Sequence, residues 1–188
     1  MVYLFLAEGF EEVEALTPLD FLRRAGVDVT TVCVGNSSNK IATGSHKIPV
    51  VCDINEMDLD NTVPFDMIIL PGGLPGADNL NASKTVNHYI ERAVNEDKYI
   101  CAICAAPYIL GERGLLKGKE ACCYPGFEDK LIGATVSQKG VVRDGKIITS
   151  RAMGKATDFA LEIIDVLCGN EMKEKLRTSV LYNKGDLL

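Results

Sequence analysis

The chain contains no tryptophan and only two histidines, His46 and His88, among its 188 residues. Any catalytic mechanism must therefore work with little imidazole, the side chain that most often moves protons near neutral pH. No apolar run approaches the roughly 20 residues that a membrane-spanning helix needs. The apolar run at residues 2–7 lacks a basic lead and runs directly into an acidic cluster, which argues against a signal peptide. We therefore expect a cytoplasmic protein without a membrane partner.

Positive charge is scarce relative to negative charge. The net charge is −6 at pH 7, which gives no reason to expect nucleic acid as a partner. The seven cysteines are odd in number and show no framework spacing, which favours free thiols in a reducing compartment. No histidine or second cysteine pair completes a zinc set, so we expect no metal. The length predicts one domain over residues 1–188 with its own hydrophobic core.

Apolar runs alternate with amphipathic segments along the chain. Strands are expected at residues 2–6, 27–34, 47–52, 67–70, 99–103 and 121–123 and as a hairpin over 141–150. Helices are expected within 13–25, 86–94, 107–113, 156–167 and 171–178, with Pro18 either kinking the first helix or starting it. This alternation predicts an α/β domain with a mainly parallel sheet and helices on both faces. In such a sheet ligands bind beyond the carboxyl ends of the strands.

Residues 99–107 form the stretch around which the chain is organised. A run rich in strand formers stops at Cys104, and small residues lead into a helical segment. Such an abrupt bend lifts its central residue out of the sheet, toward the first free N–H groups of the helix. We predict that Cys104 lies on a nucleophile elbow, where the helix dipole would favour its thiolate. The alternative is a buried core cysteine, the commonest fate of a free thiol.

Two further features fall at the same edge of the predicted sheet. The Gly72-Gly73 loop follows a strand, and its N–H groups could approach a reacting oxygen together with the amide of Ala105. A simple turn would explain the same glycines. Glu14 is the candidate acid or base, because burial beside a thiolate would raise its pKa. A charged first helical turn is the alternative for the acidic cluster.

Cys101 and Cys104 form a C-x-x-C pair, a spacing that is common in redox disulfides. If Cys101 lies on the strand, the two Cα atoms are about 10 Å apart and the side chains face opposite sides. A disulfide needs a separation of roughly 4.4–6.8 Å. We therefore expect no disulfide here, and we expect the vicinal Cys122-Cys123 pair to serve packing.

Several motifs in order along the chain resemble one family. Together they resemble the ThiJ/PfpI superfamily, and specifically the branch of the parkinsonism-associated deglycase. The matching segments are Ala7–Glu14, Pro18–Asp20, Arg23–Gly26, Leu70–Gly73, Ala102–Pro107 and Thr149–Arg151.

The resemblance carries expectations about fold, site and activity. It implies a flavodoxin-like three-layer sandwich, of the class I glutamine amidotransferase-like kind, and a homodimer. It implies Cys104 as the elbow cysteine, Glu14 as its carboxyl partner, and the amides of Gly73 and Ala105 as oxyanion donors. Arg151 joins Tyr124, Arg24 and His46 as a candidate pocket residue, the last two near or across a dimer interface. Members of that branch are described as cofactor-independent glyoxalases, protein deglycases, chaperones and sensors of oxidative stress.

Two positions depart from the pattern of the superfamily. The protease branch has a histidine directly after the cysteine, where this chain has Ala105, so we expect no peptidase activity. The deglycase branch has a His-Pro pair about twenty residues later, where this chain has Tyr124-Pro125. A phenol with a reference pKa of about 10 is a poor base at neutral pH, although it can form hydrogen bonds.

The sequence leaves three candidate functions. The first is a glyoxalase or deglycase that acts on small 2-oxoaldehydes or on their adducts with proteins or nucleotides, with no cofactor. The second is a non-enzymatic stress protein or chaperone that responds to oxidation of Cys104 to sulfinic acid. The third, a thiamine-pathway or amidotransferase-like role, has only analogy of family and fold behind it.

Overall fold

The computed structural model describes residues 1–35 and 39–182. Its main sheet has seven strands in the order β10-β11-β7-β6-β1-β2-β5, and only β10 runs antiparallel to its neighbour. These strands are β1 (Val2–Ala7), β2 (Val29–Val34), β5 (Ile54–Asn55), β6 (Met67–Leu70), β7 (Tyr99–Ile103), β10 (Val141–Asp144) and β11 (Ile147–Ser150). Two small sheets pair β3 (Ile41–Thr43) with β4 (Pro49–Val51) and β8 (Glu120–Ala121) with β9 (Thr135–Val136).

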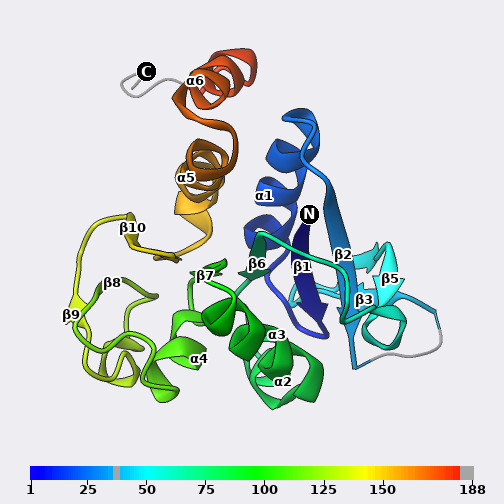
Figure 1. Cartoon of the computed structure of the whole chain (residues 1–188), viewed down its shortest axis with the longest axis horizontal. Helices are drawn as coiled ribbons and strands as arrows, with labels where there is room; N and C mark the ends of the chain where they lie inside the picture. Colours follow the sequence, from blue (N-terminus) through cyan, green and yellow to red (C-terminus); the bar gives the residue numbers. More distant parts are fainter. Residues whose placement is uncertain (36–38, 183–188) are drawn as a thin grey trace.

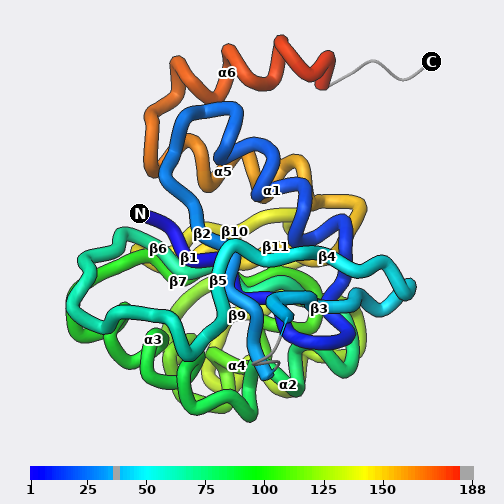
Figure 2. The backbone as a smooth tube through the Cα atoms, turned by 90° about the vertical axis from the view of Figure 1, so that its right-hand side faces the viewer, coloured from blue at the N-terminus to red at the C-terminus, as the bar shows by residue number. Residues whose placement is uncertain are grey.

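Helices cover both faces of the main sheet, as Figures 1 and 2 show. On one face lie α1 (Glu12–Arg24), α5 (Ala156–Cys168) and, beyond them, α6 (Asn170–Ser179). On the other lie α2 (Gly76–Ala82), α3 (Lys84–Asn95) and α4 (Pro107–Glu112). Short 3-10 turns span Glu56–Asp58, Glu128–Lys130 and Met153–Lys155. The predicted flavodoxin-like sandwich is confirmed.

The core is divided by the sheet into two layers, and β1 contributes to both. Val2, Leu4 and Leu6 pack on the side of α1 and α5, whereas Tyr3 and Phe5 pack on the side of α3. Alternate side chains of a strand point to opposite faces, so a strand buried on both faces is apolar throughout. This is why residues 2–7 read as one continuous hydrophobic run.

The first helix runs through Pro18, which agrees with the first of the two sequence-based expectations and excludes a start at the proline. It begins at Glu12, and Pro18 lies inside it. The side chain of Glu11 caps the helix by accepting a hydrogen bond from the Glu14 amide, 2.7 Å from oxygen to nitrogen. The helix therefore starts before the proline and brings Glu14 into its first turn.

Other boundaries are close to the predicted ones, and the differences are local. Helix α2 follows the Gly72-Gly73 loop in a segment for which the sequence predicted no element, and the strand expected at 121–123 is replaced by the two residues of β8. The hairpin of β10 and β11 is confirmed, as are α3, α5 and α6. In the described part of the chain, no helix is both long enough and apolar enough to cross a membrane.

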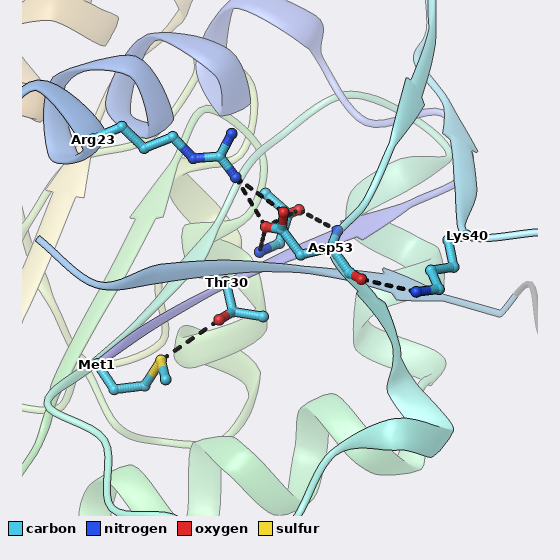
Figure 3. A network of polar contacts seen from close by, with 6 residues as sticks. Met1, Arg23, Thr30, Lys40 and Asp53 are labelled. Carbon is cyan, nitrogen blue, oxygen red and sulfur yellow. Dashed lines mark hydrogen bonds and ion pairs between the residues drawn. The ribbon is translucent and has the colours of Figure 1, made fainter.

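A polar network ties the outer strands to α1 (Figure 3). Asp53 accepts hydrogen bonds from both the amide and the hydroxyl of Thr31 on β2, at 2.8 and 2.7 Å. The guanidinium of Arg23 on α1 lies 2.9 Å from the same carboxylate, and Lys40 Nζ donates to the Asp53 carbonyl at 3.1 Å. The chain that follows β4 is thereby fixed against β2.

Candidate active site

The site lies where the sheet order reverses. From β1 the chain moves outward to β2, and it then returns to the other side of β1 as β6. Parallel sheets leave a crevice at such a switch point, beyond the carboxyl ends of the strands. Glu14 follows β1, Gly72 and Gly73 follow β6, and Cys104 follows β7.

Cys104 occupies the predicted elbow in a backbone conformation that non-glycine residues seldom adopt. Its φ is +64°, it directly follows the last residue of β7, and α4 begins at Pro107. Neighbouring segments hold this conformation: the Cys104 amide donates to the Ser150 carbonyl, and its carbonyl accepts from the Tyr124 amide, at 2.9 and 2.8 Å. Residues in sparsely populated regions cost about 1–3 kcal/mol and gather at functional sites. The tertiary structure thus maintains a strained bend that presents the thiol.

Cys101 lies apart from this bend. Its side chain is fully buried in the layer of α1 and α5, and all seven cysteines are free. Cys122 and Cys123 are buried as well, which fits their expected packing role. Cys101 and Cys104 are both free thiols in this structure.

Glu14 is almost completely buried, at 1% exposure, and forms a hydrogen bond with the Cys104 side chain. Burial, together with the charge of Glu11, raises the pKa of Glu14 to about 7. The hydrogen bonds from Cys104 and from the amides of Gly72 and Met153 oppose this rise. Glu14 therefore exchanges its proton near neutral pH, as a general acid or base must.

The prediction of an acidic thiol at position 104 is wrong for the pair as it stands in the structure. Burial raises the pKa of Cys104 to about 12, and the adjacent negative charge of Glu14 contributes to the rise. The helix invoked to stabilise a thiolate, α4, has only six residues. The two groups compete for one proton, so the thiol ionises readily only when Glu14 takes that proton.

Two backbone amides face the sulfur of Cys104. Hydrogen bonds from the amides of Ala105 and Gly73 act to lower the pKa of the thiol. Gly73 has a φ of +86°, which favours glycine, and a Cβ there would lie 2.5 Å from the Glu11 nitrogen. Amide donors that stabilise negative charge on sulfur can also stabilise it on an oxygen bonded to the attacked carbon.

Gly72 brings the thiol and the carboxyl together. Its amide donates to Glu14 Oε2 at 3.0 Å. A Cβ at this position would lie 2.6 Å from both Cys104 Cβ and Glu14 Oε2. Only a residue without a side chain leaves room for the two groups to meet.

Replacing Gly72 by alanine is expected to separate Cys104 from Glu14 and to lower any Cys104-dependent turnover by about 10². Gly154→Ala is the matched control, because its added Cβ would meet no atom within 4 Å. Steady-state rates of both variants, after circular dichroism has shown that they are folded, test this expectation. A Gly72→Ala protein as active as Gly154→Ala would contradict the assigned role of Gly72.

The candidate pocket residues are not equally close to Cys104. Tyr124 is half exposed and is joined to Cys104 through its backbone, and Arg151 follows Ser150, whose carbonyl binds the Cys104 amide. Arg24 lies ten residues after Glu14 on α1, about 15 Å along the helix axis, and pairs with Asp20 at 2.6 Å. Within one chain, the structure thus brings Tyr124 and Arg151 near the elbow but not Arg24.

His46 is held by the buried carboxylate of Glu12. Its Nδ1 lies 2.7 Å from Glu12 Oε2, and its backbone amide donates to Oε1 at 2.8 Å. The hydrogen bond to Glu12 raises the pKa of His46. Burial alone would raise the pKa of Glu12, but the hydrogen bonds that it accepts, including those from His46, lower it overall. Glu11, Glu12 and His46 each place one potential ligand atom within 4.8 Å of the others. The helix cap and the ion pair account for these contacts, and we assign no metal to them.

Three contributors were missed by the sequence analysis. They are the amide of Gly72, the amide of Met153 and the carbonyl of Ser150. The pair of glycines after β6 was a usable signal for the first. No sequence signal indicates the other two, because backbone groups of any residue type would serve.

The fold and this geometry define a class of α/β proteins in which an elbow cysteine meets a buried carboxyl at the switch point of a parallel sheet. The sequence profile of the DJ-1/PfpI family matches residues 1–166, and the chain belongs to that family.

Known proteins similar to this chain come from several kingdoms. Arabidopsis thaliana protein DJ-1 homolog B is 40% identical over 90% of this chain, but the match spans only 39% of that relative. Glutathione-independent glyoxalase DJR-1.2 of Caenorhabditis elegans is 32% identical over 90% of this chain and 89% of its own. The structure of oxidised Toxoplasma gondii DJ-1 superposes with a TM-score of 0.91 at 34% identity, covering 96% and 97% of the two chains.

Proposed function

We propose that this protein is a cysteine-dependent glyoxalase or deglycase that converts small 2-oxoaldehydes, or their early adducts with proteins or nucleotides, into 2-hydroxy acids. The observation that carries the proposal is the contact between the Cys104 thiol and the buried Glu14 carboxyl, with two amides facing the sulfur. The C. elegans relative, whose name describes a glutathione-independent glyoxalase, supports the same chemistry.

In the proposed first step, the sulfur of Cys104 attacks the aldehyde carbon while Glu14 accepts the thiol proton. A carboxyl with a pKa of about 7 is suited to this task near neutral pH. The amides of Gly73 and Ala105 stabilise the oxyanion. Glu14 returns the proton to this oxygen, which completes a hemithioacetal and frees the carboxylate for the next step.

In the second step, Glu14 removes the proton from the former aldehyde carbon and delivers it to the adjacent carbon, while the hydroxyl proton passes to the neighbouring ketone oxygen. The result is a thioester of a 2-hydroxy acid on Cys104. Water then hydrolyses the thioester, and the sulfur recovers a proton. The sum is one 2-oxoaldehyde plus one water giving one 2-hydroxy acid, so the reaction requires no external oxidant or reductant.

A homodimer belongs to this proposal. Val13 at the start of α1 and Ile48 and Val51 around β4 are large apolar side chains that one chain leaves exposed. Because α1 and the β3–β4 hairpin also carry Arg24 and His46, a second copy on this surface would bring both residues to an interface. We propose that they reach the substrate pocket there, as the family resemblance implies.

The test of the enzymatic proposal is direct. Purified protein is mixed with methylglyoxal, and D- and L-lactate are measured separately. We expect lactate to form with the wild-type chain and to be lost with Cys104→Ala. No lactate above that variant would overturn the enzymatic proposal.

The second candidate function is a redox-responsive stress protein, and it is favoured by the partial exposure of Cys104 among mostly buried cysteines. Mild peroxide followed by mass spectrometry tests it. We expect sulfinic acid at Cys104 before any other cysteine is oxidised. Oxidation spread evenly over all seven cysteines would count against this function.

A further inference from the structure

Two other cysteines lie against each other outside the active site. Cys33 on β2 and Cys52 directly after β4 lie close enough for each thiol to shift the pKa of the other. Both are buried, and both belong to the apolar layer on the side of α1, together with Ala42 of β3. Nothing in the proposed glyoxalase chemistry uses them.

The backbone around this pair is fixed on both sides. Thr31 and Cys33 are two residues apart on β2, so their side chains point to the same face. Asp53, next to Cys52, binds both the amide and the hydroxyl of Thr31, and its own amide donates to that hydroxyl at 2.8 Å. The Cys52 amide donates to the Lys40 carbonyl at 2.7 Å. These bonds hold Cys52 beside the strand that carries Cys33.

We propose that Cys33 and Cys52 are a redox-sensitive pair that forms a reversible intramolecular disulfide and thereby fastens the β3–β4 hairpin to β2. Each thiol loses one proton, the pair loses two electrons, and one S–S bond forms. The co-reactant is a two-electron thiol oxidant: an azo dicarboxamide such as diamide becomes its hydrazine, and a peroxide becomes water.

An oxidant can reach the buried pair when the β3–β4 hairpin opens locally. The β3–β4 sheet has only two strands of three residues each and is separate from the main sheet. Isolated two-stranded hairpins are marginally stable, so this one can open locally and expose Cys52. Burial raises the pKa of Cys52 to about 12, which makes the closed state slow to react.

The disulfide would affect the surroundings of the active site. The hairpin turn contacts the loop before α1: the Gly9 amide donates to Thr43, and the Ser45 amide donates to Phe10, at 2.7 and 2.8 Å. The carbonyl of Gly9 would in turn lie 2.6 Å from a Cβ at Gly73. Fastening the hairpin therefore restricts the loop that packs against an oxyanion donor.

The experiment uses the full chain carrying Cys104→Ala, so that its failure is independent of the proposed function. After diamide treatment and alkylation of the remaining thiols, non-reducing peptide mapping should find the Cys33–Cys52 linked peptide. The number of titratable thiols in denaturant should fall by two, and dithiothreitol should restore them. Amide hydrogen exchange across β3 and β4 should slow on oxidation.

Three controls make the result decisive. Cys33→Ser and Cys52→Ser, each in the same background, should abolish the link, and Cys168→Ser, at an exposed position, should retain it. The peptide map of the parent Cys104→Ala chain does not depend on the serine variants, so a serine variant that misfolds leaves the test intact. A link between Cys122 and Cys123 alone, dimers joined through Cys52 or Cys168, or unreacted Cys33 after prolonged oxidation would overturn the proposal.

Discussion

Replacing Glu14 by glutamine is expected to remove a pH dependence from the stability of the protein. The pKa of Glu14 is about 7 in the folded chain, against a reference value of 4.5. Between these values the folded state binds more protons than the unfolded state, so the free energy of unfolding falls as pH rises. The full loss amounts to about 3 kcal/mol by pH 8, at 1.36 kcal/mol for each pKa unit.

The amide of the introduced glutamine is neutral at every relevant pH, so the variant should lose this slope. Urea unfolding of both proteins from pH 4 to pH 8 measures it, with Glu91→Gln on the exposed face of α3 as a control. We expect the free energy of unfolding of Glu14→Gln, relative to that of the wild type, to rise by about 3 kcal/mol between pH 4 and pH 8. Parallel pH profiles for all three proteins would show that the carboxyl is not held neutral by burial.

The same substitution should also abolish catalysis, because the amide cannot accept the thiol proton or carry a proton between carbons. Loss of a positioned general base lowers rates by about 10²–10⁴. A variant that is more stable above pH 7 but inactive would be the combined signature of a catalytic carboxyl. A variant that is both more stable and fully active would show that Glu14 serves only to shape the site.

Replacing Cys104 by serine is expected to lower the rate of lactate formation by at least about 10³, because a hydroxyl is a much weaker nucleophile than a thiol. The change replaces one sulfur by a smaller oxygen at a half-buried position, so the fold should persist. Cys168→Ser, at an exposed position on α5, is the matched control and should keep full activity. Product formation from methylglyoxal is the measurement.

A second readout separates loss of the nucleophile from damage to the site. With Cys104→Ser, Glu14 stays buried and keeps its amide donor from Gly72, so the pH dependence of unfolding should persist. If the serine variant instead retains a tenth or more of the wild-type rate, covalent catalysis through Cys104 is contradicted.

Much of the fold was predictable because it follows from local rules. The continuous apolar run of β1, the stripe of α3 and the Asp-Gly turn between β10 and β11 each have a periodicity or a turn signal of their own. The elbow was predictable for a similar reason, since a strand former followed by small residues and a proline restricts the backbone locally. The start of α1 was not predictable in this way, because the cap from Glu11 competes with the proline at position 18.

The sequence by itself determined the main alternation of strands and helices, but not α2 or the short strands β3, β5 and β9. It also determined the bend at Cys104 and the gathering of chemistry at one edge of the sheet, because these depend on neighbouring residues and on the parallel arrangement. Only the tertiary structure decided which groups share a proton and which thiols meet. Glu14 and Gly72 are 58 residues apart, and the raised pKa of Cys104 arises from burial and from the charge of Glu14. Desolvation and contact depend on how segments far apart in the sequence pack together, and the local pattern of residues does not specify that packing.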